Sequence, residues 1–166
     1  RFLIRPMDIQ TKKEISENLE EIEQKKKKAR ENSLKDAVYV NGTAGFGDSY
    51  ISAYGIALGA SPAEVGFLTS FPSLVGSLAQ ALTSRVMLRV SRKRIFSASI
   101  LLQSLTWVPI ILLPILFLRD IKYTPFLLII FYTIYAAFGN FSAPAWSSWI
   151  GDLVPKKEIG RFFGRR

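Results

Sequence analysis

The sequence contains no cysteine and no histidine among its 166 residues. It therefore has no disulfide framework, no Ser-His-Asp or Cys-His nucleophile and no zinc site of the usual ligand set. We expect a protein that is not an enzyme and that needs no cofactor or metal. Charge is also scarce over long stretches, because residues 1–36 hold 18 of the 35 Lys, Arg, Asp and Glu side chains. Most of the remaining chain is apolar.

Four segments are long and apolar enough to cross a bilayer, which takes about 20 residues of helix. They are residues 37–59, 62–84, 95–118 and 123–151. An apolar helix can also form the centre of a large soluble protein, but this chain has too little polar sequence to cover four such helices. We predict an all-α integral membrane protein in which a charged extension, residues 1–36, precedes four transmembrane helices and a basic segment, residues 152–166, follows them.

The basic residues are distributed unevenly between these spans. Residues 1–36 contain ten Lys and Arg, and residues 85–94 and 152–166 contain five each. Residues 59–64 contain none, and residues 119–122 contain two. Cytoplasmic loops of membrane proteins carry the excess of Lys and Arg. We therefore expect a multi-pass protein of the plasma membrane with both ends in the cytoplasm.

The charged extension has a weak helical pattern. Glu21 lies four residues before Lys25, and Glu23 lies four before Lys27, so two ion pairs could support a short surface helix. The lysines at 25–28 allow two interpretations. They attract anionic lipid, or they form a solvated run whose field the neighbouring glutamates largely cancel.

The first and fourth spans share a short motif at their centres. Phe46-Gly47-Asp48 in one corresponds to Phe138-Gly139-Asn140 in the other. Three membrane crossings separate the two motifs, so they run in opposite directions, as the inverted repeats of secondary transporters do. In such proteins the solute site lies near the membrane midplane at equivalent positions of the repeats. The sequence therefore predicts a site at Asp48 and Asn140.

Asp48 is the strongest candidate because an ionised carboxylate within the bilayer costs about 2.5 to 3.5 kcal/mol and is usually functional. It could carry a proton or bind a cationic group. Asn41 and Ser52 lie on the same helical face as Asp48, and Ser147 lies on the same face as Asn140. For Asp48 and Asn140 alike, a hydrogen bond that only joins two helices remains an alternative.

Two loops resemble those of the major facilitator superfamily. Residues 88–93, Leu-Arg-Val-Ser-Arg-Lys, are similar to the second half of its signature loop, Gly-x-Leu-x-Asp-Arg-x-Gly-Arg-Lys. Residues 151–166 are similar to the loop after its fourth span. The chain departs from the family pattern at four positions: Leu88 replaces an acid, Ser84 and Ser91 replace glycines, and Ile159 replaces an arginine.

The resemblance implies a cytoplasmic gate in which loop charges lock helix ends in one conformation. Its residues here are Arg89, Arg92, Asp152 and Arg161. Because the signature acid is missing, we expect Asp152 to pair with Arg89 or Arg92. The same arginines could instead serve only as positive-inside determinants.

The resemblance also implies a function, namely secondary active transport of a small solute by alternating access, with Asp48 as a proton-coupling group. The expected partners are the bilayer, a small solute, a proton and the remaining transmembrane helices of a twelve-span bundle, of which this chain supplies four. No nucleic acid partner is expected. The alternative is a non-transporting four-span membrane scaffold or assembly subunit. A channel is disfavoured, because no charged ring or filter-like loop is visible.

Overall fold

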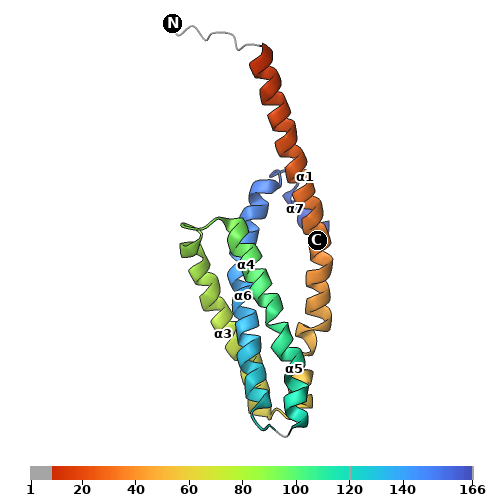
Figure 1. The fold of residues 1–166 in the computed structure, drawn as a ribbon, viewed down its shortest axis with the longest axis vertical. Helices are drawn as coiled ribbons and strands as arrows, with labels where there is room; N and C mark the ends of the chain where they lie inside the picture. Colours follow the sequence, from red (N-terminus) through yellow and green to blue (C-terminus); the bar gives the residue numbers. More distant parts are fainter. Residues whose placement is uncertain (1–8, 120, 166) are drawn as a thin grey trace. The chain divides into compact units, whose positions relative to one another are not determined.

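The computed structural model describes residues 9–119 and 121–165, and within them every regular element is a helix, as predicted. Figure 1 shows the chain as a set of helices joined by short connections. The elements are α1 (Ile9–Phe46), the 3-10 helix η1 (Asp48–Tyr50), α2 (Ile51–Ala57), α3 (Pro62–Val86), α4 (Arg92–Leu105), α5 (Trp107–Leu118), α6 (Thr124–Leu153) and α7 (Ile159–Arg165).

These helices belong to two compact units. The first, here called the tail unit, combines Arg1–Val40 with Leu153–Arg166. The second, here called the span unit, is Asn41–Asp152. Helix α1 runs through the boundary, since it begins in the tail unit and ends in the span unit.

By length and composition, three helical segments of the described chain can cross a membrane. They are Pro62–Val86, Arg92–Leu118 and Thr124–Leu153. They coincide with the second, third and fourth of the predicted spans. The first predicted span, residues 37–59, is divided between the end of α1, η1 and α2. That this divided segment also crosses the membrane stays a prediction.

The division of the first span occurs at Gly47, a residue type that weakens helices. A β-carbon here would lie 2.7 Å from the carbonyl oxygen of Thr43 and 2.8 Å from the ring of Trp107, so only glycine fits. Just after the break, Ser49 donates a hydrogen bond to the carbonyl of Ala44 at 2.8 Å. This bond satisfies one of the carbonyls left open at the end of α1.

The third span is also divided, because α4 ends at Leu105 and α5 begins at Trp107. Pro109 explains the break, since its ring clashes with the carbonyl four residues earlier and supplies no N–H to it. Pro114 removes the partner of the Ile110 carbonyl in the same way. The hydroxyl of Tyr54, from α2, donates to that carbonyl at 2.7 Å. The bundle therefore satisfies a backbone group that proline leaves open, as a membrane interior requires.

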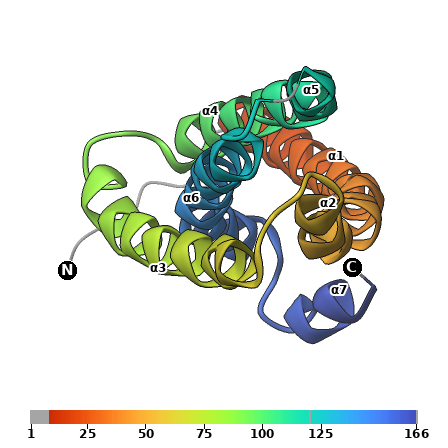
Figure 2. The same cartoon turned by 90° about the horizontal axis from the view of Figure 1, so that it is seen from below.

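Within the span unit, α6 lies between α3 and α4, as Figures 1 and 2 agree. Thr83, fully buried in α3, donates a hydrogen bond across to the carbonyl of Phe141 in α6 at 2.9 Å. Helix α3 starts with the predicted capping box, in which Ser61 and Glu64 satisfy each other's backbone amides. These interactions orient the helices that surround the pocket described below.

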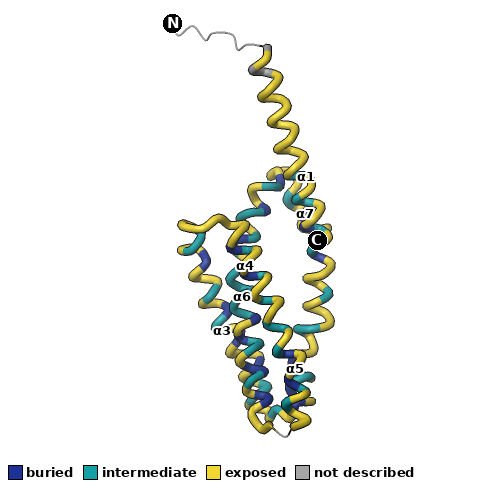
Figure 3. Tube along the Cα trace, in the orientation of Figure 1, coloured by how far each residue is buried: buried dark blue, intermediate teal, exposed yellow. Residues whose placement is uncertain are grey.

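The apolar core of the span unit gathers near η1, α2 and the adjoining ends of α3, α5 and α6, where buried positions are dense in Figure 3. Its buried members are Ile51, Leu58, Leu68, Ile110, Leu113, Leu128 and Ile129. The outer surface is apolar as well, and Leu101 and Ile111 are 63% and 67% exposed. Large apolar side chains that face outward along spanning helices suit contact with lipid.

In the tail unit, α1 carries the predicted ion pair between Glu21 and Lys25, 2.6 Å apart. The hydrogen bond and positive charge of Lys25 lower the pKa of Glu21. The second predicted pair is wrong in its partner, because Glu23 contacts Lys26 at 3.4 Å rather than Lys27. Positions three apart are also neighbours on a helix, so either lysine is within reach.

Candidate functional site

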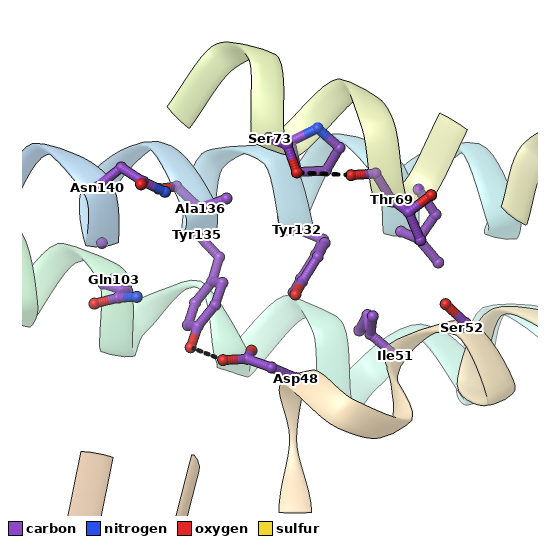
Figure 4. Close-up of a pocket in the computed structure, with 13 residues that line it drawn as sticks. Asp48, Ile51, Ser52, Thr69, Ser73, Gln103, Tyr132, Tyr135, Ala136 and Asn140 are labelled. Carbon is purple, nitrogen blue, oxygen red and sulfur yellow. Dashed lines mark hydrogen bonds between the residues drawn. The ribbon is translucent and has the colours of Figure 1, made fainter. Parts of the chain in front are cut away.

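A polar pocket of about 450 Å³ lies among η1, α2, α3, α4 and α6 of the span unit. Figure 4 shows side chains from all of these elements directed toward one space. Its lining residues are Asp48, Ile51, Ser52, Leu68, Thr69, Pro72, Ser73, Gln103, Tyr132, Tyr135, Ala136, Gly139 and Asn140. Asp48 is the only charged residue in this set. We call the space the Asp48 pocket.

Asp48 occupies the first position after the break in the first span. The hydroxyl of Tyr135, on α6, donates a hydrogen bond to Oδ2 of Asp48 at 3.2 Å (Figure 4). The other carboxylate oxygen, Oδ1, is buried and has no hydrogen-bond partner among the described residues. A buried oxygen without a partner is costly, so this atom is open to a proton or to a donor group from a bound solute.

Aromatic rings hold Tyr135 in place. Its ring stacks on that of Tyr132 with centroids 5.5 Å apart and planes 15° apart. Trp107 meets the same ring edge-on, with centroids 5.3 Å apart. Such contacts restrict the side chain beyond simple burial. The phenol that reaches Asp48 is thus positioned by neighbours from α5 and α6.

The two glycines of the repeated motif both lie against the third span. Gly47 packs on Trp107, as described above, and a β-carbon on Gly139 would lie 2.5 Å from Nε2 of Gln103. Gln103 and Trp107 are four residues apart, on either side of the break at Thr106. Close approach at both glycines places the residues that follow them, Asp48 and Asn140, at the same pocket.

Asn140 reaches the pocket from α6. Its amide nitrogen donates to the carbonyl of Ala136, on its own helix, at 2.9 Å. Gly76 of α3 packs against the same side chain, since a β-carbon there would lie 2.6 Å from the amide nitrogen. Close contact with α3 therefore limits the space that the Asn140 amide has.

Of the five residues predicted for the solute or proton pathway, Asp48, Asn140 and Ser52 line the pocket. Asn41 and Ser147 are exposed residues of the span unit and are not among the lining residues. The pathway role of all five stays a prediction. Inspection of the sequence missed Gln103, Tyr132 and Tyr135. The sequence offers a weak signal for Tyr132 and Tyr135, because both are aromatic residues with a polar group in the same predicted span as Asn140, but their spacing from Asn140 does not place them on one helical face.

Three of the loop residues predicted for the gate belong to the span unit and one to the tail unit. Arg92, at the start of α4, forms an ion pair with Asp152, near the end of α6, so the expected contact of Asp152 with one of the two arginines is confirmed. Arg89 is exposed, and Arg161 belongs to the tail unit. The gating role of these residues stays a prediction.

No group of three or more Asp, Glu, His or Cys residues capable of holding a metal ion occurs in the described parts of the chain. The chemistry that the Asp48 pocket offers is therefore that of one carboxylate, two phenols, two amides and a few hydroxyl groups. These groups can exchange a proton and can hydrogen-bond or stack on a small organic solute.

The fold and this pocket define a helical protein of the multi-pass membrane class with a polar site between its helices. Residues 40–166 match the family model of the Major Facilitator Superfamily, which covers most of the chain, so the protein belongs to that family. It is a transporter family rather than an enzyme family, and its members sit in the bilayer and bind small solutes. Searches of curated proteins and of solved structures gave no match.

Proposed function

We propose that the protein carries out secondary active transport of a small solute by alternating access, with the Asp48 pocket as the solute site and Asp48 as the proton-coupling group. One observation carries the proposal. Asp48 and Asn140 are equivalent residues of the two motifs and line one pocket, in which an oxygen of Asp48 is buried and has no hydrogen-bond partner in residues 9–119 and 121–165.

The proposed proton step is simple. Oδ1 accepts a proton from hydronium while the pocket faces one side of the membrane, so an O–H bond of hydronium breaks, water is left and the carboxylate becomes a neutral acid. The O–H bond of this acid breaks on the other side and returns the carboxylate and a free proton. Neutralisation matters because the move between the two states then carries no unpaired charge through the apolar bundle. Tyr135 holds the other oxygen and keeps Oδ1 directed to the pocket.

We also propose that loop charges lock the ends of α4 and α6 together in one conformation, and the ion pair of Arg92 with Asp152 supports this role. Arg92 lies in the first turn of α4, where the helix dipole is positive, and Asp152 lies in the last turn of α6, where it is negative. Each charge is thus at the unfavourable end of its own helix, and the pairing offsets both effects. A partly exposed pair of this kind is worth about 1 kcal/mol or less, so it can break in each cycle.

We propose the plasma membrane as the location and the cytoplasm as the side of residues 1–36, 85–94 and 152–166. The support is the positive-inside pattern, since these segments contain twenty of the 22 Lys and Arg residues.

The test uses the full-length protein in liposomes that contain a pH-sensitive dye. A panel of sugars, amines, peptides and drugs is added outside, and solute-dependent movement of protons is recorded. Asp48→Asn should abolish this movement and keep solute exchange, because the amide has the same shape but cannot release a proton. Glu20→Gln, which neutralises an exposed carboxylate on α1, is the control and should behave like the wild type. Proton movement at the wild-type rate in the Asp48→Asn protein would exclude this role.

A further inference from the structure

The tail unit contains a second pocket, which the proposed transport cycle does not use. It has a volume of about 210 Å³ and lies between α1 and the segment that runs from residue 153 into α7. Its lining residues are Lys27, Arg30, Glu31, Leu34, Val154, Glu158, Arg161, Phe162 and Arg165. We call it the basic pocket.

The basic residues come from one face of each helix. Lys27, Arg30 and Leu34 follow the three- and four-residue spacing of one face of α1, and Arg161 and Arg165 are four apart on α7. Arg30 and α7 are separated by more than a hundred residues, so their convergence is a property of the fold. A requirement for positive charge in cytoplasmic loops does not explain it, because that requirement concerns charge number and not placement.

The unit is assembled around these charges. Arg30 is half-buried and donates a hydrogen bond from its guanidinium group to the carbonyl of Leu153 at 3.2 Å. Val154 and Phe162, two of the three apolar residues of the lining, are only 4% and 8% exposed. These side chains form an apolar wall beside the cations, of which Arg30 is half-buried and Lys27, Arg161 and Arg165 are exposed.

The four cations form no ion pairs within the part of the chain that the structure describes. Among the described residues, no carboxylate lies within ion-pair distance of Lys27, Arg30, Arg161 or Arg165. The two glutamates of the lining reduce the net formal charge of the pocket to plus two. A cavity in which four cations outnumber two carboxylates favours an anion as the occupant.

We propose that the basic pocket binds a phosphate monoester group. A monoester carries about 1.5 to 2 negative charges near neutral pH, which matches the net charge of the pocket, whereas a diester carries one. Three of the four cations are arginines, whose planar guanidinium groups bind phosphate oxygens in pairs. A group held there bridges α1 and α7. The monoester can belong to a lipid headgroup or to a soluble phosphate.

The test uses the full-length protein in neutral detergent, with retained lipid counted by native mass spectrometry. The probes are phosphatidic acid, a monoester, and phosphatidylglycerol, a diester, and inorganic phosphate serves as a competitor. Wild-type protein should retain phosphatidic acid in preference to phosphatidylglycerol. The double variant Arg161→Gln with Arg165→Gln should lower the affinity for the monoester by at least about tenfold, because it removes two charge-assisted contacts.

The matched control is Lys156→Gln with Lys157→Gln. It removes the same charge from the same segment but from residues outside the pocket, and it should retain phosphatidic acid as the wild type does. Arg161→Lys with Arg165→Lys keeps the charge and loses the paired geometry, so its affinity should fall between those of the wild type and the glutamine variant. This variant tests the proposal even where the glutamine variant is poorly folded.

The outcomes separate the sources of the phosphate. Displacement by inorganic phosphate, with direct binding of inorganic phosphate alone, supports a soluble ligand. Selective retention of phosphatidic acid without such displacement supports a lipid headgroup. The variant Arg161→Gln with Arg165→Gln and the control Lys156→Gln with Lys157→Gln could lose the same affinity for phosphatidic acid. Such equal losses would mean general electrostatic attraction and would overturn the proposal. Absence of any preference for the monoester, together with no binding of inorganic phosphate, would overturn it too.

Discussion

The phenol of Tyr135 donates its hydrogen to Oδ2 of Asp48 at 3.2 Å and so joins the middle of α6 to the break in the first span. Tyr135 lies five residues, or about 1.4 turns, before Asn140, so the same helix supplies both the partner of Asp48 and its counterpart in the repeat. Helix α6 therefore holds Asp48 at the pocket through Tyr135 and contributes Asn140 to the same pocket directly.

The first prediction concerns this hydrogen bond. Tyr135→Phe should destabilise the full-length protein by about 1 kcal/mol, because it leaves the second carboxylate oxygen without a partner. The same substitution in an Asp48→Ala background should cost clearly less, since no acceptor remains. Equilibrium unfolding in detergent of the two single variants and the double variant measures the coupling, expected to be at least about 0.5 kcal/mol. Additive effects would show that the bond contributes nothing.

The second prediction concerns the glycine at the break. Gly47→Ala should destabilise the protein by about 1 to 3 kcal/mol, because the new β-carbon meets a backbone carbonyl and a large ring that cannot both move away. Gly139→Ala should cost less, since the flexible end of Gln103 can shift. The same unfolding measurement checks both.

Gly45→Ala is the control for these variants. No atom lies within 4 Å of a β-carbon at this helical position, so the substitution should be neutral or stabilise by up to about 1 kcal/mol. If Gly45→Ala and Gly47→Ala have equal effects, the close approach of Trp107 is not what requires glycine at the break.

The third prediction concerns the ion pair between the loops. Arg92→Gln and Asp152→Asn should be coupled by at least about 0.5 kcal/mol in a double-mutant cycle on unfolding, and added salt should weaken the coupling. Arg89→Gln combined with Asp152→Asn should be additive, since no ion pair joins these two residues in the structure. Additivity in both cycles would leave the arginines as topology determinants only.

The fourth prediction concerns topology and uses the absence of cysteine from the chain. Cysteine placed at Glu20 or Lys157 should be protected from an impermeant thiol reagent outside intact cells, and cysteine at Ala60 or Lys122 should react. Labelling at Lys157 would reverse the orientation of the last three spans. Labelling at Glu20 alone would show that the divided first span does not cross the membrane.

Much of the fold could be predicted from the sequence, because membrane-spanning helices must satisfy their own backbone groups and therefore leave long apolar runs. The start of α3 was also predictable, since Ser61 and Glu64 form a local motif. The breaks at Gly47 and Thr106 were not predicted. The break at Gly47 depends on what a neighbouring helix supplies, namely the ring of Trp107, whereas the break at Thr106 follows from Pro109 in the same segment.

The candidate site was predictable only in part. The repeated motif identifies Asp48 and Asn140 without any structure. Gln103 and Tyr135 lie on other elements or other turns, and their relation to Asp48 arises from packing between helices, for which the sequence has no periodic signal. Asn41 shows how the break affects such reasoning. It shares a helical face with Asp48 only if the first span is one continuous helix, and the break at Gly47 interrupts that face.

Gly47 and Gly139 contact the third span on opposite sides of Thr106, and this arrangement has a mechanical consequence. Gly47 rests on α5 through Trp107, and Gly139 rests on α4 through Gln103. A bend at Thr106 would turn the helix that contacts Gly47 relative to the helix that contacts Gly139. The separation of Asp48 and Asn140 would then depend on the angle of the third span, although this span contributes only Gln103 to the lining of the pocket.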